Sequence, residues 1–207
     1  MDAFSDKLNT LVDEIASDGY SIVDHFLSRE EIDSILELDD FKNSLLHFKK
    51  AGIGDTINKQ INEGIRGDYI QWIDRATAPH PLRNYLSKLE GLISAVNQGL
   101  FLSLKDYEVH LTNYPPGSYY RRHLDQFKKD DHRKLSVICY LNKNWKVEEG
   151  GQLRIYHPDG ERDVLPLAGR LVCFRSDLLE HEVLPASRPR MSLTGWMLDQ
   201  YTDLKHL

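Results

Sequence analysis

The sequence lacks any apolar run long enough to cross a bilayer as a helix, and its first residues, MDAFSDKLNT, lack the basic start and apolar stretch of a secretory signal. We therefore expect a cytoplasmic protein with no membrane partner. Cysteine is also scarce, with two residues in a chain of 207. Because Cys139 and Cys173 both stand in apolar, strand-like runs, we predict two buried free thiols and no disulfide.

Positive charge is not in excess either. The chain has 26 lysines and arginines against 32 acidic residues, a net charge of −6. This balance speaks against a broad cationic face for nucleic acid, although it allows local basic patches, and no nucleic-acid partner is expected. Hydrophobic residues make up 41% and charged residues 28% of the chain, which is typical of globular proteins. We expect a single domain over residues 1–207.

The first half of the chain has the pattern of helices. An apolar stripe at helical spacing runs through the first residues and stops at Gly19, a common residue after a helix end. Ser28 and Glu31 are spaced as a capping box, which predicts a second helix start. A longer amphipathic pattern over residues 81–101 predicts a third helix. Residues 1–100 are thus expected to supply helical support.

From about residue 104 to 199, short β-rich runs alternate with turn residues. Examples are KDYEVHLTNY, KLSVICYLN, GRLVCFRS and RMSLTGWML. Several short strands at even spacing indicate an antiparallel sandwich or barrel. The second half of the chain is therefore expected to be mainly β.

Two residues of the run YYRRHLDQF have the spacing of metal ligands. His123 and Asp125 stand two apart, so in a strand both side chains leave one face roughly 7 Å apart along the chain. His181, at the head of a later strand, supplies a third ligand. A His-x-Asp pair followed by a distant His is typical of non-heme iron sites, which keep three positions open for other ligands. His157 and Asp159 have the same spacing, but Pro158 breaks the strand and predicts a hairpin corner.

An arginine follows the third ligand in the run RPRMSLTGW. Arg190 and Ser192 alternate onto one face of a predicted strand, and an arginine buried there requires an anionic partner. Its planar guanidinium suits a carboxylate bound through two parallel hydrogen bonds. Arg188 is the rival, but Pro189 separates it from the strand and predicts a loop position. The other histidines, His110 among them, stand in no comparable arrangement and are interpreted as surface or core residues.

Several motifs in order give the chain a family resemblance from about residue 64 to 199. They are IRGDYIQWI, NYPPGSYYRRHLD, the run from Arg133 through YLNKNW, EGGQLRIY, and HEVLP followed by Arg190 and GWMLD. The sequence resembles the 2-oxoglutarate oxygenases, and within them the prolyl hydroxylase branch that includes the animal oxygen-sensing enzymes and their bacterial relatives. This implies a mainly β fold with N-terminal helices, in which residues 104–199 form a double-stranded β-helix, a jelly-roll or cupin-like core.

The resemblance also implies roles for single residues. It places the iron ligands at His123, Asp125 and His181, and the 2-oxoglutarate clamp at Arg190 and Tyr114. The segment between Tyr114 and His123 is one residue shorter than in the animal enzymes, so the position of Tyr114 departs from that pattern. Further matches are pocket-lining positions, where ordinary core packing is the alternative, and substrate-binding positions: Ile138, Tyr140, Val183 and Trp196 for the pocket, and Asp68, Trp72, Tyr120 and Arg133 for the substrate.

The implied activity is 4-hydroxylation of a prolyl residue in a protein, with succinate and carbon dioxide as co-products. It requires iron(II), 2-oxoglutarate and dioxygen, with ascorbate as a candidate stimulant. For the bacterial branch, a translation elongation factor of the Tu type is the expected substrate. The alternatives are the same chemistry on a small molecule or free amino acid, a barrel that senses 2-oxoglutarate or metal without turnover, and a redox-inert metalloenzyme, for which Arg190 has no obvious use.

A segment over residues 51–74 is rich in Gly, Asn and Asp and has no sustained helical period, which predicts a mobile hairpin or lid. Gly64 and Gly67 give it hinge freedom, and Trp72 offers an apolar surface for a prolyl ring. We expect residues 65–72 to close over a bound peptide, with Asp68 paired to Arg133. The alternative is an ordinary hairpin whose Trp72 packs into the core.

Overall fold

The computed structural model describes residues 3–42, 48–51, 65–126 and 130–202. The middle of the expected lid, residues 52–64 with Gly64, lies outside them. No helix in this described part is long and apolar enough to span a membrane. The helical segments are α1 (Ala3–Asp18), α2 (Arg29–Leu36), α3 (Asp39–Lys42), α5 (His80–Leu100) and the 3₁₀ turn η1 (Val147–Glu149). The strands are β1 (Tyr20–Val23), β2 (Lys49–Lys50), β3 (Tyr69–Trp72), β4 (Asp106–Tyr114), β5 (Tyr120–His123), β6 (Arg133–Tyr140), β7 (Leu153–His157), β8 (Gly160–Val164), β9 (Leu171–Arg175), β10 (Glu180–Val183) and β11 (Arg190–Leu198).

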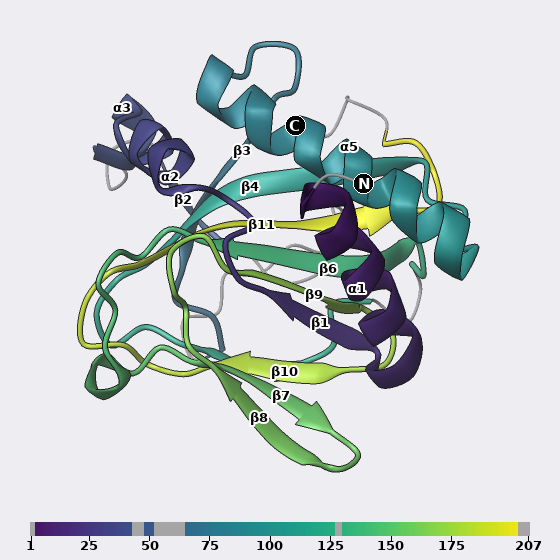
Figure 1. Ribbon diagram of the computed structural model, residues 1–207. Coiled ribbons are helices and arrows are strands. Elements are labelled where there is room, and N and C mark those ends of the chain that lie inside the picture. Colours follow the sequence, from purple (N-terminus) through teal and green to yellow (C-terminus); the bar gives the residue numbers. More distant parts are fainter. Residues whose placement is uncertain (1–2, 43–47, 52–64, 127–129, 203–207) are drawn as a thin grey trace.

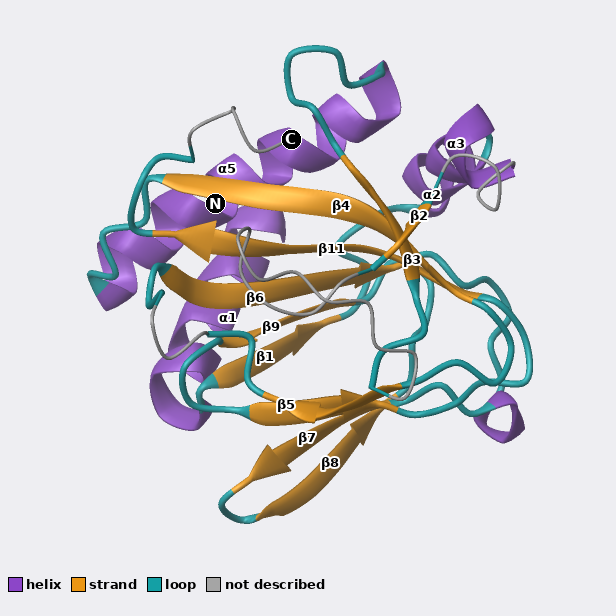
Figure 2. Cartoon of the chain, turned by 180° about the vertical axis from the view of Figure 1, so that it is seen from behind, coloured by secondary structure: helices purple, strands orange, loops and turns teal. Residues whose placement is uncertain are grey.

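The strands form two antiparallel sheets, one above the other (Figures 1 and 2). The larger sheet has seven strands in the order β1-β9-β6-β11-β4-β3-β2, and the smaller has four in the order β5-β10-β7-β8. Consecutive strands of the chain often lie in different sheets, as β9, β10 and β11 do. The expectation of a mainly β, antiparallel core with N-terminal helices is therefore confirmed.

The three predicted helices are present as α1, α2 and α5, within one or two residues of the expected positions, whereas α3 and η1 were not predicted. In α1 the chain leaves the helix at Gly19, whose φ of 77° is a backbone conformation that glycine adopts without strain. The cap of α2 is a complete capping box, because Ser28 accepts from the Glu31 amide and the Glu31 carboxylate accepts from the Ser28 amide. Both α1 and α5 lie across the outer face of the larger sheet (Figure 1). They bury the apolar stripe that their spacing predicts.

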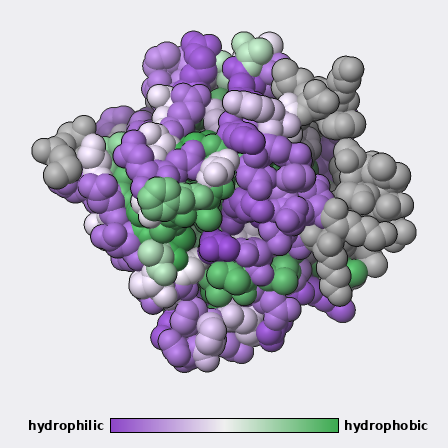
Figure 3. Space-filling model, turned by 90° about the vertical axis from the view of Figure 1, so that its right-hand side faces the viewer, coloured by the Kyte–Doolittle hydropathy of each residue, from purple (hydrophilic) through white to green (hydrophobic). Residues whose placement is uncertain are grey.

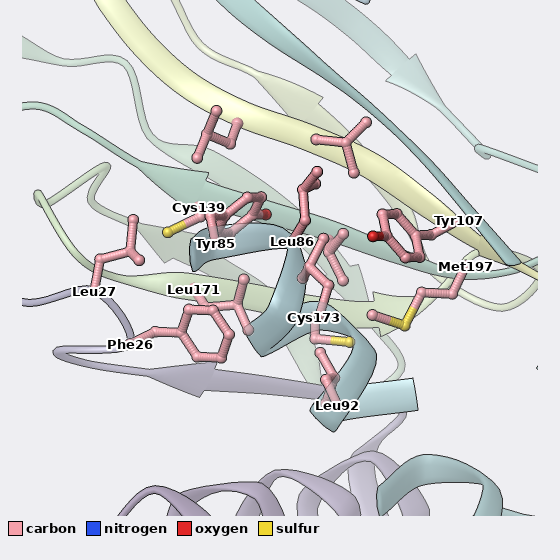
Figure 4. Packing of buried hydrophobic residues seen from close by; sticks show 14 of the residues in the cluster. Phe26, Leu27, Tyr85, Leu86, Leu92, Tyr107, Cys139, Leu171, Cys173 and Met197 are labelled. Carbon is pink, nitrogen blue, oxygen red and sulfur yellow. The ribbon is translucent and has the colours of Figure 1, made fainter. Parts of the chain in front are cut away.

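The period of two in the strands divides their side chains between two cores. In β6, Leu135, Val137 and Cys139 face the helices, whereas Ile138 and Tyr140 face the space between the sheets. Figure 4 shows the helix-side core, in which both cysteines lie among leucines and aromatic rings. Cys139 and Cys173 are buried and free, as predicted. The face of the sheet away from the helices is therefore the one available for a site.

Two local expectations have different outcomes. His157 and Asp159, which have the same spacing as His123 and Asp125, are confirmed to lie at a hairpin corner, because β7 ends at His157 and β8 begins at Gly160. The end of the expected hairpin or lid is a strand, since Tyr69–Trp72 pairs with β4, and Tyr69 and Ile70 also pair antiparallel with β2. The closure of residues 65–72 over a peptide stays a prediction. The side of the molecule in Figure 3 is mainly hydrophilic, with a limited area of apolar side chains.

Candidate active site

The three predicted metal ligands come together between the sheets. His123 in β5 and His181 in β10 are direct cross-strand partners. Nε2 of His123 lies 3.3 Å from Oδ1 of Asp125, and Nε2 of His181 lies 3.7 Å from Oδ2. One ligand atom from each residue falls within 4.8 Å of the others, a group that could hold a metal ion. The expectation that Asp125 also lies in the strand is wrong, because β5 ends at His123.

Hydrogen bonds fix the direction of each of these side chains. Nδ1 of His123 lies 2.6 Å from the carbonyl oxygen of Arg121, and Nδ1 of His181 lies 3.3 Å from that of Leu179. A carbonyl can only accept, so each Nδ1 donates and each Nε2 keeps its lone pair toward the third ligand. In the bend after β5, the Ser136 hydroxyl donates to Oδ2 of Asp125 over 2.6 Å. This bond leaves Oδ1 as the free coordinating oxygen.

The protonation states suit a divalent cation. Burial lowers the pKa of His181 to about 4, so this imidazole is neutral at physiological pH. Burial alone would raise the pKa of Asp125, but His181, His123 and the Ser136 hydroxyl outweigh it and hold the pKa well below its usual value. A neutral imidazole and an ionised carboxylate are the forms that bind metal.

Arg190 lies at the other end of the same inter-sheet space and is 1% exposed. Its Nε donates to the carbonyl oxygen of Gly151 over 2.9 Å, and its Nη2 to the Tyr140 hydroxyl over 3.3 Å. The guanidinium carbon lies 5.2 Å from the centre of the Tyr114 ring. Within the described part of the chain, no carboxylate forms an ion pair with Arg190. A buried, unpaired guanidinium is costly, so this geometry favours an anionic ligand.

Gly151 is required at this contact. Its φ is +72°, and a Cβ built there would meet Ala186 at 2.9 Å and Cδ of Arg190 at 3.4 Å. The glycine of the EGG motif therefore lets the backbone approach the arginine closely enough to accept its Nε hydrogen bond.

A single pocket joins the triad to Arg190. It contains about 410 Å³ of empty space, counting its open mouth. The sequence predicts a role for ten of its lining residues and none for the other four, Arg66, His110, Thr112 and Thr194. The lining residues are Arg66, Asp68, His110, Thr112, Tyr114, Tyr120, His123, Asp125, Ile138, His181, Val183, Arg190, Thr194 and Trp196.

The expected ion pair between Asp68 and Arg133 is wrong. Asp68 is 0% exposed and pairs with Arg66, whose Nε and Nη2 donate to its two oxygens over 2.6 and 2.9 Å. Arg133 instead donates to Glu108, with 2.6 Å for the shorter bond, and lies over the Trp196 ring. Arg66 is only two residues from Asp68 in the chain, and its guanidinium can donate two parallel hydrogen bonds as well as that of Arg133 could. The nearer arginine therefore binds the carboxylate.

The two aromatic residues expected at the substrate end differ in their positions. Tyr120 lines the pocket and stacks on the His123 ring, with ring centres 3.6 Å apart. Trp72 is outside the pocket lining and packs edge-on against His110, with ring centres 4.9 Å apart. Its position in β3 agrees with the core alternative more than with a lid surface.

Sequence reasoning missed several pocket residues, above all His110, which had been interpreted as an ordinary surface or core histidine. In β4 it alternates with Thr112 and Tyr114, so all three point to the inner face. The predicted role of Tyr114 together with the period of two was the signal that could have found the other two. Arg66 and Thr194 were missed as well.

The residues present fit both groups that this chemistry needs. Two imidazole nitrogens and one carboxylate oxygen on one side of an ion are the donor set of non-heme iron(II) centres that keep open positions. A dicarboxylate suits the rest of the pocket, because Arg190, which has no carboxylate partner in the described chain, can donate to one carboxylate and lines the same pocket as the triad.

Known proteins share this architecture. The profile described as "2OG-Fe(II) oxygenase superfamily" matches residues 109–198. Prolyl hydroxylase EGLN3 of Mus musculus is 32% identical over 87% of this chain and 79% of its own length. The chain spans 27% to 55% of the length of other curated relatives that it matches.

Two solved structures agree with the fold. A prolyl-4-hydroxylase of Pseudomonas putida is 42% identical and superposes with a TM-score of 0.84 over 94% of this chain and 100% of its own. A prolyl hydroxylase of Trichoplax adhaerens, solved with a peptide fragment of the hypoxia inducible factor oxygen degradation domain, is 29% identical, with a TM-score of 0.85 over 95% of this chain and 90% of its own.

The fold and the site thus define a double-stranded β-helix oxygenase. Within that class, the chain belongs to the prolyl hydroxylases of the 2OG-Fe(II) oxygenase superfamily. It is a dioxygenase of the prolyl-4-hydroxylase type, and its family needs iron(II), 2-oxoglutarate and dioxygen.

Proposed function

We propose that this protein hydroxylates a prolyl residue of a protein substrate at C4, with iron bound by His123, Asp125 and His181 and 2-oxoglutarate bound by Arg190. One observation carries the assignment of residues. The His-Asp-His group and a buried guanidinium without a carboxylate partner in the described chain lie in one pocket. An anion that also binds metal is the ligand that such a pocket fits.

The metal ligands are set for binding by their own hydrogen bonds. The backbone carbonyls of Arg121 and Leu179 hold the two imidazoles with Nε2 facing Asp125. Ser136 holds one oxygen of Asp125 and is itself 2.9 Å from Ser176. These contacts give a preorganised set of two nitrogens and one oxygen, which leaves the remaining positions to the co-substrates.

Bound iron and 2-oxoglutarate supply the oxidising chemistry, in which dioxygen, the keto acid and a prolyl C–H become hydroxyproline, succinate and carbon dioxide. The chain's own residues bind, orient and exclude water. Arg190 and Tyr114 neutralise and orient the far carboxylate. The side chains of Ile138, Val183 and Trp196 make part of the pocket wall apolar, which limits water near the reacting centre.

The substrate end of the pocket involves the segment around residues 65–68. Arg66 forms a β-bridge with Tyr120 and stacks on its ring at 4.8 Å. The buried Arg66–Asp68 pair therefore supports one side of the pocket beside His123. We assign Asp68, Tyr120 and Arg66 to the binding of the peptide, and place Trp72 and Arg133 behind them as packing support.

A protein substrate is favoured because the Trichoplax relative was solved with a peptide fragment. A translation elongation factor of the Tu type is the candidate that the resemblance to the bacterial branch suggests. Free proline is the contrasting substrate, since it presents two charged groups that the apolar wall would have to bury.

The activity test uses the purified chain with iron(II), 2-oxoglutarate and ascorbate. Candidates are elongation factor Tu, peptides from its proline-containing loops, the same peptides with alanine for proline, and free proline. We expect one added oxygen on a single proline-containing peptide and on the intact factor, with equimolar succinate. Hydrolysis and amino-acid analysis would identify 4-hydroxyproline. Turnover of free proline without turnover of any peptide would contradict the protein-substrate assignment.

A separate test addresses the metal and co-substrate residues. Anaerobic addition of iron(II) and 2-oxoglutarate should give the weak visible charge-transfer band of a chelated keto acid. Asp125→Ala should lose the band, whereas Asp159→Ala, at the hairpin corner between β7 and β8, should keep it. Equal bands in both variants would place the metal elsewhere.

A further inference from the structure

Two buried ring nitrogens on the inner face of the larger sheet have no hydrogen-bond partner among the described residues. They are Nε2 of His110 and Nε1 of Trp196. His110 is 0% and Trp196 6% exposed, and both line the pocket. A buried polar atom without a partner costs about 1–3 kcal/mol. Two in one pocket point to a ligand that supplies the missing partner.

Strand register places both nitrogens at the metal end of the pocket. Arg190 pairs with Tyr114 across β11 and β4, and Thr194, four residues along β11, pairs with His110. Trp196 is opposite Ser136 in β6. Because the Ser136 hydroxyl bonds Asp125 over 2.6 Å, this end of β11 lies beside the triad. The pocket therefore has a charged pole at Arg190 and a second, neutral pole at His110 and Trp196.

The second pole can donate to an oxygen. An indole Nε1 carries a hydrogen and can only donate. Nδ1 of His110 lies 2.8 Å from the Thr112 hydroxyl, which can donate to it and leave the hydrogen on Nε2. Burial, with the Arg66 and Arg133 guanidiniums nearby, lowers the pKa of His110 to about 3, so the ring stays neutral. A neutral donor pair suits an anion already charge-compensated by a metal.

We propose that His110 and Trp196 bind the carboxylate of 2-oxoglutarate that lies beside the keto group, through the oxygen that the metal does not hold. The proposal rests on the proposed co-substrate site and adds a second recognition pole to it. That carboxylate oxygen would otherwise be buried without a donor, at a cost of several kcal/mol.

The test uses two analogues that each replace one carboxylate of 2-oxoglutarate by a methyl group. 2-Oxopentanoate keeps the carboxylate beside the ketone, and 4-oxopentanoate keeps only the far one. Their affinities are measured by calorimetry on the full chain loaded with manganese(II), which prevents turnover. The variants are His110→Phe and Trp196→Phe, which remove an N–H and keep a ring, and Arg190→Met for the other pole. Trp72→Phe is the matched control, since Trp72 touches His110 but lies outside the pocket lining.

Each pole should respond to its own carboxylate. His110→Phe and Trp196→Phe should each raise the Kd of 2-oxoglutarate and of 2-oxopentanoate roughly tenfold, because each variant loses one hydrogen bond to a charged group. The Kd of 4-oxopentanoate should not change. Arg190→Met should weaken the binding of 2-oxoglutarate and of 4-oxopentanoate and leave the binding of 2-oxopentanoate unchanged. His110→Gln, which restores an N–H donor, should recover part of the loss, and Trp72→Phe should change nothing.

Two results would overturn the inference. If His110→Phe weakened the binding of all three ligands equally, His110 would contribute only to the shape of the pocket. If it weakened none but raised the KM for peptide, the donor pair would serve the substrate. Failure of the Arg190→Met pattern alone would instead contradict the proposed co-substrate site, so the two ideas fail separately. Thermal unfolding of each variant without ligand checks that the fold is intact.

Discussion

Replacement of Arg190 gives the sharpest test of the site, because its structural and functional roles predict opposite effects on stability. The side chain is 1% exposed, and its hydrogen bonds to the Gly151 carbonyl and the Tyr140 hydroxyl reach neutral acceptors. A buried charge without an opposite partner destabilises a protein, so an apolar side chain of similar length in its place removes that cost. Arg190→Met should therefore unfold at the same temperature as the wild type or a higher one when no ligand is present.

Ligand should reverse this order. At a concentration one hundred times its Kd, 2-oxoglutarate adds about 2.7 kcal/mol to the stability of a protein that binds it. For a domain of this size that is roughly 5–10 °C in Tm. The wild type loaded with manganese(II) should show this rise and Arg190→Met should not. Differential scanning calorimetry, with and without the keto acid, gives both values.

Arg190→Lys separates charge from geometry. Lysine keeps the positive charge but cannot make two parallel hydrogen bonds, and one bond to a charged group contributes about 1.5–3 kcal/mol. The apparent 2-oxoglutarate requirement should rise about 10- to 100-fold, while kcat at saturation changes little. Arg188→Lys is the control, because Arg188 pairs with Glu149 and lies over the Trp145 ring. A fall in Tm of ligand-free Arg190→Met, with unchanged 2-oxoglutarate binding, would refute the clamp and leave a structural arginine.

Three further predictions concern other charged groups. Asp125→Ala should abolish turnover but keep the far-ultraviolet circular dichroism of the wild type; full activity would mean another carboxylate binds the metal. Asp68→Ala should lower stability by about 3–5 kcal/mol, because it strands the buried Arg66, and Arg66→Met with Asp68→Leu should recover most of that; additive losses in urea unfolding would contradict a coupled pair. Asp24→Asn should cost about 0.5 kcal/mol at pH 7, since the hydrogen bond from Arg170 lowers the pKa of this exposed, solvent-screened carboxyl. A lowered folded pKa stabilises above the unfolded value of 3.8 and loses that effect as the pH falls; an equal cost in urea at pH 3 would disprove it.

Local patterns predict this fold well because two periods run through it without conflict. The helical stripe of α5 and the alternation in β6 each follow from residue spacing alone, and each is buried as expected. The metal ligands were found by spacing together with the family resemblance. His123 and Asp125 do converge, but the reason differs from the expected one. The strand ends at His123, and the bond to Ser136 turns Asp125 inward.

The ion-pair partners of residues that are far apart in the chain could not be predicted from the sequence. Asp68 was assigned to Arg133 because both positions belong to the resemblance, and nothing in the order of residues shows which arginine reaches the carboxylate. In the structure Arg66 lies close enough to offer two nitrogens to the same side chain. Arg133 lies over Trp196 and donates to Glu108, which stands opposite Trp196 across β4 and β11. Ion-pair partners depend on these registers, which short-range patterns do not encode.

His110 shows how a single known position can extend a prediction. Its type and spacing match no ligand motif, so on its own it reads as a core histidine. Once Tyr114 is placed in the pocket, however, alternation along β4 puts His110 and Thr112 on the same inner face. An apolar side chain at position 110 would fill this place without a desolvation cost, whereas the histidine leaves a buried nitrogen unpaired. Such a nitrogen lowers stability unless a ligand satisfies it, and for this reason we connect His110 with the co-substrate and not with the core.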